Sequence, residues 1–248
     1  MATANPAMNE GVYLRAERAT IATGMMTVQG TVVKTAVLLA ILLVAAGYTW
    51  SQASQGSSQL VTLLLIGGSI GGIVLALATV FFPKISPYTS PVYAACQGCT
   101  MGAISSYFET KFPGIAIQAL GLTVGVLSVM LFLFSTRIVR ATEKFKIGVV
   151  AATGAIALVY LVGFIASFFG SGIPYIHESG WIGVGFSVVV VVIAALNLIL
   201  DFDFIEQGVS RRAPKYMEWY GGFSLLVTLV WMYLEILRLL AKLRSSRD

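Results

Sequence analysis

The residues best suited to chemistry stand in one apolar stretch, LNLILDFDFIE, at positions 196–206. No side chain between positions 183 and 200 ionises, and then Asp201 and Asp203 follow among large apolar residues. A carboxylate at the edge of a hydrocarbon layer is costly and normally faces protein or water. We therefore expect any active centre of this chain to be built around Asp201.

Helix geometry separates the two aspartates. Asn197 and Asp201 are four positions apart and share a helix face, whereas Asp203 points about 160° away from Asp201. Two interpretations remain open: both acids are interfacial residues at a helix end, or Asp201 has a specific partner inside a bundle. The helix dipole disfavours an acid near a helix C-terminus, which favours the second interpretation.

A buried carboxylate must be neutralised or must find a counter-charge, so Asp201 is a candidate proton-responsive group. We expect Asp201 to be buried and hydrogen-bonded to Asn197 or to Thr228 of the last apolar stretch. Asp203 should be the more exposed of the two aspartates.

The last apolar stretch carries two further acids. Glu218 lies near its start, at a depth similar to that of the aspartates, and is a candidate coupled second acid. Glu235 is followed three positions later by Arg238, a spacing that suits an ion pair on one helix. We interpret this ion pair as structural, near the membrane edge.

Other reactive residues give no catalytic or metal site. Cys96 and Cys99 supply two thiols, whereas a structural zinc site needs four ligands, and the only histidine, His177, falls in a predicted loop. The HExxH, GxSxG and P-loop patterns do not occur. An intramembrane aspartyl protease would need two aspartates from different helices in GxGD-type surroundings. We therefore expect a protein without enzymatic activity, cofactor or metal ligands.

The composition is that of a membrane protein. Of 248 residues, 57% are hydrophobic and 11% are charged, where a soluble domain carries about 25% charged residues. The net charge of +5 suits loops that touch anionic lipid headgroups. Lysines and arginines stand at the ends of apolar runs rather than in a patch with aromatic residues, so nothing indicates nucleic acid as a partner.

The chain divides into a polar N-terminal arm, residues 1–30, and a membrane domain, residues 31–248. The arm lacks the apolar core and cleavage site of a signal peptide. About 20 apolar residues span a bilayer, and the sequence predicts seven such helices. Their ranges are 31–50, 60–82, 91–108, 113–136, 145–169, 181–206 and 215–240. The third is the most polar, so we expect other helices to shield it.

Basic residues in the short connections predict a cytoplasmic N-terminus. With that orientation the four basic residues of the 137–146 loop lie inside, and only Lys111 lies outside before the last helix. Seven crossings then place the basic C-terminus outside, against the same rule. A re-entrant last segment would avoid this, but the stretch at 216–240 is long enough to cross, so we favour seven crossings.

Small residues recur four positions apart in several predicted helices. Gly67 and Gly71, and Gly68 and Gly72, have this spacing in the second helix, and Gly121 and Gly125 have it in the fourth. The fifth helix adds Ala151, Gly154, Ala155 and Ala157. Such spacing lets helices approach closely in a membrane, and we expect packing within the chain rather than dimerisation. For the last helix, Gly221, Gly222 and Ser224 predict close neighbours at its start.

Short motifs in order along nearly the whole chain resemble the Bax inhibitor-1/YccA superfamily of seven-helix membrane proteins, in a bacterial branch. They are MTVQGTVVKT, SPVYAACQG, GAISSYFE, FPGIAIQA, TEKFKIGVVAATGAIALVYLV, ALNLILDFDFIEQGV, APKYMEWYGGF and LVWMYLEILRLL. The resemblance implies an all-α bundle of seven transmembrane helices with the last helix surrounded by the others.

The resemblance also implies a site. In the family, an aspartate at the end of the sixth helix meets one on the seventh, and their protonation is taken to open or close a calcium leak path. Asp201 falls on the sixth-helix aspartate, but Thr228 stands near the seventh-helix position and cannot ionise. The second helix has no arginine, Lys84 lies just beyond it, and Gln97 stands where many relatives have glutamate.

The sequence therefore predicts a multi-pass protein of the bacterial plasma (inner) membrane that leaks or senses cations, calcium first, with Asp201 as the titrating group. The alternative is an interaction protein that modulates a quality-control membrane protease or another membrane complex without transport. Expected partners are the lipid bilayer, calcium ion and, under the alternative, that protease complex.

Overall fold

The structure is a computed structural model that describes residues 24–168 and 181–246. Within these ranges the regular elements are helices, apart from one isolated β-bridge between Met25 and Pro214. The α-helices are α2 (Val28–Ser54), α3 (Ser58–Phe81), α4 (Ser86–Lys111), α5 (Ile115–Ser135), α6 (Glu143–Phe168), α8 (Trp181–Ser210) and α9 (Met217–Ser245), with a 3₁₀ turn η2 (Pro83–Ile85) before α4. His177 and most of the predicted polar arm lie outside the described residues.

The predicted all-α fold is confirmed. Six of the α-helices in the described ranges, all except α4, are long and apolar enough to cross a membrane. Helix α4 was predicted to begin at Pro91, but it begins at Ser86, because Pro87 is tolerated in a first turn that needs no backbone donor. Helix α9 runs to Ser245, five residues past its predicted end, with Lys242 and Arg244 in the last turn, where cations complement the helix dipole.

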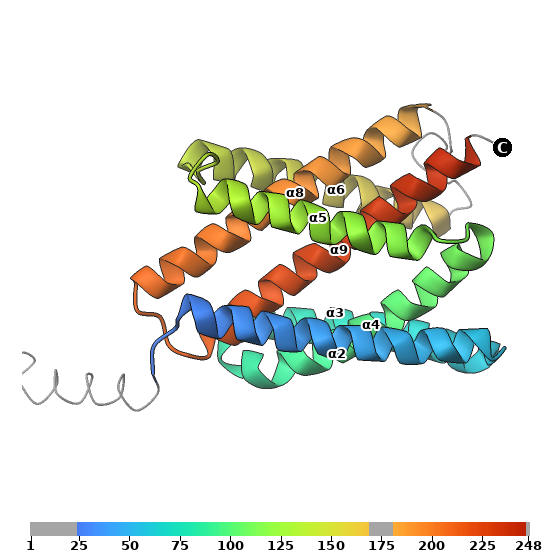
Figure 1. Cartoon of the computed structure of the whole chain (residues 1–248), viewed down its shortest axis with the longest axis horizontal. Helices are drawn as coiled ribbons and strands as arrows, with labels where there is room; N and C mark the ends of the chain where they lie inside the picture. Colours follow the sequence, from blue (N-terminus) through green and yellow to red (C-terminus); the bar gives the residue numbers. More distant parts are fainter. Residues whose placement is uncertain (1–23, 169–180, 247–248) are drawn as a thin grey trace, which may run out of the picture.

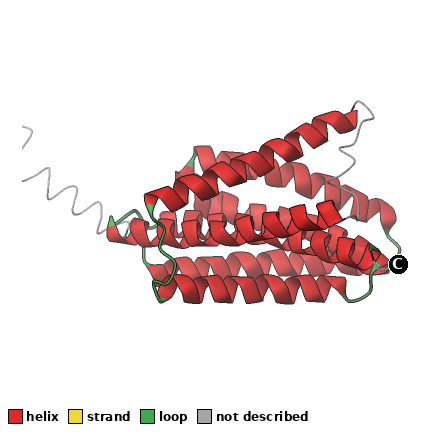
Figure 2. Cartoon of the chain, turned by 90° about the horizontal axis from the view of Figure 1, so that it is seen from above, coloured by secondary structure: helices red, strands yellow, loops and turns green. Residues whose placement is uncertain are grey.

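The helices lie side by side in two groups (Figures 1 and 2). Helix α4 packs against α2 and α3, and α8 packs against α5 and α6. Helix α9 contacts members of both groups, namely α2, α4, α5 and α8. We call the end of the structure at which α2 and α9 begin and α8 ends the N-terminal end, and the opposite end the far end.

Burial increases sharply in the last helix. In its most apolar stretch 56% of the residues are buried, against 11–39% in the other five apolar helices. Leu226, Met232 and Leu237 of α9 are fully enclosed, as is Leu198 of α8. Helix α4 also buries polar side chains, among them Ser90, Thr100 and Ser105, against α2, α3 and α9, so the prediction that other helices shield it is confirmed.

Glycines set the closest helix approaches. A Cβ atom added at Gly98 or Gly102 of α4 would lie 2.3 Å from the carbonyl oxygen of Leu42 or Ala46 on α2. A Cβ atom added at Gly68 of α3 would lie 2.5 Å from the Cys96 carbonyl oxygen of α4, which confirms packing within the chain at that position. Gly121, Gly125 and Gly154 have no such neighbour within 4 Å, so their spacing does not mediate packing here.

Candidate functional site

Asp201 lies inside the protein, as predicted, with 8% of its surface exposed. It stands two and a half turns before the end of α8, on the side that packs against α9. The hydroxyl of Ser224 donates to Oδ1 at 2.5 Å, and the hydroxyl of Thr228 donates to Oδ2 at 2.6 Å. The two donors are four residues apart on α9 and therefore share one face of that helix.

Both carboxylate oxygens are thus held by neutral hydroxyl groups. No lysine or arginine in the described ranges lies within ion-pairing distance of Asp201. Hydrogen bonds to an ionised group are strong, about 1.5–3 kcal/mol each, but they do not neutralise the charge. The arrangement is one in which the carboxyl must hold a proton or attract a cation.

The sequence identified only part of this set. Thr228 was predicted as a partner of Asp201 and is one, whereas Asn197, the other candidate, instead donates to Thr153 Oγ1 on α6 and to its own helix, both at 2.8 Å. Ser224 was expected only to allow close packing, and its bond to Asp201 was missed. Ser224 stands one turn before Thr228, so the two hydroxyls share a helix face, and this spacing could have identified it as a second partner of Asp201.

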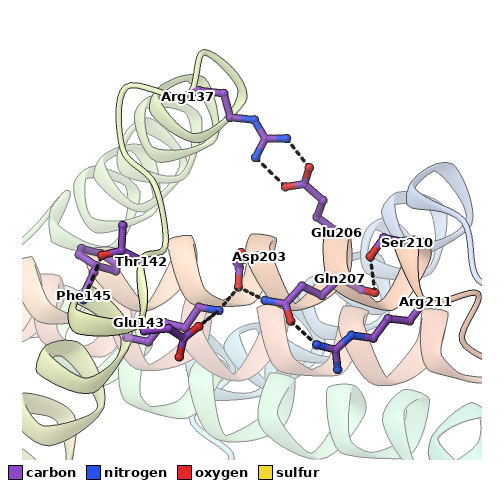
Figure 3. A network of polar contacts seen from close by, with 10 residues as sticks. Arg137, Thr142, Glu143, Phe145, Asp203, Glu206, Gln207, Ser210 and Arg211 are labelled. Atoms are coloured by element: carbon purple, nitrogen blue, oxygen red, sulfur yellow. Dashed lines mark hydrogen bonds and ion pairs between the residues drawn. The ribbon is translucent and has the colours of Figure 1, made fainter.

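Asp203 points to a different part of the structure and is more exposed than Asp201, as predicted. Its side chain is 20% exposed, Lys146 Nζ of α6 lies 2.9 Å from its Oδ2, and Gln207 donates to the same oxygen (Figure 3). Lys146 also reaches Glu143 at 3.2 Å. Asp203 therefore ties α8 to the start of α6 and does not belong to the Asp201 site.

A second tie joins α8 to the α5–α6 connection. Arg137 and Glu206 form a two-bond ion pair, which Figure 3 shows above the Asp203 group. The hydrogen bonds and charge of Glu206 raise the pKa of the Arg137 guanidinium. Arg137 has a φ of +59°, a backbone conformation that residues other than glycine rarely adopt. The ion pair helps to hold this turn in place.

Glu218 does not pair with Asp201 in this structure. It is 2% exposed, and its Oε1 accepts the backbone N–H of Thr27 at 3.1 Å and the Thr27 hydroxyl at 2.9 Å. Thr27 is the N-cap of α2. The carboxylate of Glu218 thus covers the start of another helix, where the helix dipole favours a negative charge. Glu218, the candidate coupled second acid, therefore binds Thr27 instead of Asp201.

The predicted ion pair near the far end is confirmed. Arg238 Nη1 lies 2.9 Å from Glu235 Oε1, and Glu235 is almost fully buried. Tyr160 of α6 donates to the other carboxylate oxygen at 2.9 Å, a contact that the sequence did not reveal. One turn further, Lys242 donates to the Gly183 carbonyl and to Ser187. These contacts join the far end of α9 to α6 and α8.

The described part of the chain also contains two sizeable cavities. One of about 800 Å³ opens at the far end, where its lining includes Trp50, Tyr107 and Arg238. Another, of about 510 Å³, is an apolar groove between α2, α4, α5 and α9. Asp201 lines neither of them. The described residues contain no group of three potential metal ligands, and Cys96 and Cys99 are both free thiols.

Comparison with known proteins supplies a family. No curated protein and no solved structure matches the chain. A family model described as "Bax inhibitor 1 like" matches residues 5–245, nearly the whole chain, including α8, α9 and the Asp201 site between them. The protein therefore belongs to the Bax inhibitor 1 like family of membrane proteins.

Proposed function

We propose that the protein is a non-enzymatic cation leak or sensor in the bacterial plasma (inner) membrane, with calcium as the first candidate ion. In this proposal α4 also crosses the bilayer, which makes seven spans arranged around α9. The proposal places the N-terminal end in the cytoplasm. It is supported by the basic residues gathered there, which include Arg137 and Arg211 (Figure 3) and Lys146, the partner of Asp203 near the end of α8.

The observation that carries the proposal is the hydroxyl-held, buried carboxyl of Asp201. Ser224 and Thr228 orient it with 2.5 and 2.6 Å hydrogen bonds, yet nothing basic among the described residues compensates its charge. A stable structural acid in a low-dielectric interior normally has such a counter-charge. A carboxyl and two hydroxyls also supply the oxygen ligands that calcium prefers.

The side chains at the site supply only part of a calcium coordination sphere. Calcium takes about 6–8 oxygen ligands, and the two carboxylate oxygens and two hydroxyls make four. Weak and incomplete coordination suits a transit or sensing site, because an ion must also leave it. The protonated acid would close the contact between α8 and α9, and the ionised acid would attract a cation.

The test is calcium flux into liposomes that contain the purified protein, measured at several values between about pH 5 and pH 8, where titration of a buried carboxyl is expected. Asp201→Asn keeps the side-chain volume and cannot ionise. It should preserve the fold and remove most of the pH dependence of the flux. Asp203→Asn is the matched control, because it lies two residues away on the same helix and binds Lys146 instead.

A Glu218 coupled to Asp201, as the sequence predicts, would give Glu218→Gln an intermediate effect on that pH dependence. Since Glu218 bonds to Thr27 in the structure, its effect should be close to that of Asp203→Asn. If the wild-type protein passes no calcium at any pH in this range, the leak proposal is wrong. The modulator of a membrane protease or another complex would then be the remaining candidate.

A further inference from the structure

The N-terminal side of the Asp201 site is closed by a short segment that comes from outside both helices. Residues 24–27 precede α2 and run along residues 213–215, which join α8 to α9. Met26 N donates to the Ala213 carbonyl at 2.8 Å, and Lys215 N donates to the Gly24 carbonyl at 3.2 Å. These two backbone bonds flank Met25 and fix the chain up to Met26.

Met26 inserts its side chain between α8 and α9. It is 2% exposed, whereas its neighbour Met25 is 42% exposed. A Cβ atom added at Gly208 of α8 would lie 2.7 Å from Met26 Sδ, and one added at Gly221 of α9 would lie 3.5 Å from Met26 Cε. Each helix therefore presents a glycine to the methionine, and together they form a notch that the thioether fills.

This notch lies on the same helix faces as the acid site. On α8, Asp201, Ile205 and Gly208 follow at intervals of four and three residues, so they line one face. On α9, Gly221, Ser224 and Thr228 follow at intervals of three and four. The two rows are in contact at their middle, where a Cβ at Gly221 would lie 3.1 Å from Ile205 Cγ1.

The order along the α8–α9 seam is therefore acid site, then the Ile205–Gly221 contact, then Met26. Seven residues separate Asp201 from Gly208, which corresponds to about 10 Å along the helix axis. Gly221 has no side chain, and a Cβ atom there would lie 3.1 Å from both Ile205 Cγ1 and Thr31 Cγ2 of α2, so these two residues fill the space beside it. Met26 completes the apolar filling at the N-terminal end, where it lies against Gly208, and its flexible thioether suits an irregular gap.

We propose that Met26 is a plug that closes the N-terminal end of the α8–α9 seam beneath Asp201, and that the Gly24–Thr27 segment must move for the site to open to water. Glu218 holds the plug, since it binds the backbone N–H of the next residue, Thr27. The inference rests on the proposed function for its consequence in transport, but the closure itself can be tested without transport.

The test measures water access to the acid site. In a Cys96→Ser/Cys99→Ser background, Ser224→Cys places a thiol beside Asp201, and its rate of reaction with a charged, water-soluble thiol reagent is measured in nanodiscs. Met26→Ala should raise this rate severalfold. Met25→Ala, an identical change at the exposed neighbour, should leave it unchanged, and so should Met26→Leu, which keeps the apolar volume.

A rescue variant distinguishes opening of the seam from a general loss of stability in Met26→Ala. Met26→Ala combined with Gly208→Leu refills the notch from α8 and should return the rate toward that of the parent. Equal labelling of the Met26→Ala and parent proteins would overturn the plug.

Measurement of calcium flux in the same variants distinguishes failure of the Met26 plug from failure of the proposed leak function. If Met26→Ala raises thiol labelling and also raises calcium flux relative to Met25→Ala, both stand. If labelling rises while no variant passes calcium, the plug stands and the leak function fails. If calcium passes in the wild type but Met26→Ala changes neither labelling nor flux, the leak function stands and the plug is wrong.

Discussion

At the scale of single residues, the site depends on hydroxyl groups that no charge pattern marks. Thr228 stands where the family resemblance led us to expect a second acid, and the structure shows that its hydroxyl still meets Asp201. A neutral donor replaces the shared proton that two facing carboxylates would need. The pair of Asp201 and Thr228 therefore contains one ionisable side chain instead of two.

Thr228→Val tests what that hydroxyl contributes. Valine keeps the shape and removes the donor to Asp201 Oδ2, so the folded state should lose about 1.5–3 kcal/mol, the value of a hydrogen bond to a charged group. The measurement is thermal unfolding in detergent at a pH at which the acid is ionised. In the Asp201→Asn background the same change should cost less, because the remaining bond is between neutral groups.

Thr123→Val, measured with and without Asp201→Asn, is the control for Thr228→Val. Thr123 is as buried as Thr228, but its hydroxyl only returns to the Ala119 carbonyl of its own helix. Its loss should therefore be small and independent of Asp201. Equal losses at Thr123 and Thr228 would show that the Asp201 bond contributes nothing particular.

At the scale of helices, most of the sequence prediction holds and the exceptions share one cause. Apolar runs of about 20 residues gave the helices with ends mostly within a few residues, because length and hydropathy decide them locally. The rotation of each helix depends on how it packs against others. That is why Thr153 could not be named as the partner of Asn197, nor Lys146 as that of Asp203.

Two glycines of α2 also have different surroundings that the sequence alone does not reveal. A Cβ atom at Gly30 would fall 2.0 Å from Glu218 Oε1, whereas one at Gly47 would meet nothing within 4 Å. Alanine normally stabilises a helix relative to glycine by about 0.5–1 kcal/mol. Gly47→Ala should therefore raise the unfolding temperature of the protein in detergent.

Gly30→Ala should lower that temperature despite the same helix preference. The added methyl group displaces the buried Glu218 carboxylate from the Thr27 N–H and hydroxyl, and a buried acceptor left without its donors costs about 1–3 kcal/mol. The double variant Gly30→Ala/Glu218→Ala should be no less stable than Glu218→Ala alone, because the clash is gone. A stabilising Gly30→Ala would contradict the placement of Glu218.

At the scale of the whole molecule, the described chain begins and ends on opposite ends of the structure. Gly24 lies at the N-terminal end, and α9 carries the chain to the far end (Figure 1). The proposed seven crossings would have this result, because an odd number of spans places the two ends on opposite sides. In the proposed orientation the basic C-terminal turn would lie outside the cytoplasm, where Lys242 and Arg244 donate to the Gly183 and Pro113 carbonyls.

Labelling of intact cells tests this orientation. In the Cys96→Ser/Cys99→Ser background, a cysteine at Thr142, in the exposed connection before α6, should resist a membrane-impermeant reagent added outside. A cysteine at Gln55, in the turn between α2 and α3 at the far end, should react readily. Reaction at Thr142 with protection at Gln55 would invert the proposed topology.

The contact between Glu218 and Thr27 also bears on the order in which the protein is assembled. The two residues are 191 positions apart, and synthesis delivers the chain from its N-terminus. Helix α2 therefore enters the membrane long before the carboxylate that covers its first amide exists. In the growing chain this amide must stay hydrated at the membrane surface until α9 arrives. Of the described helices, the one inserted first is consequently fastened at its start by the one inserted last.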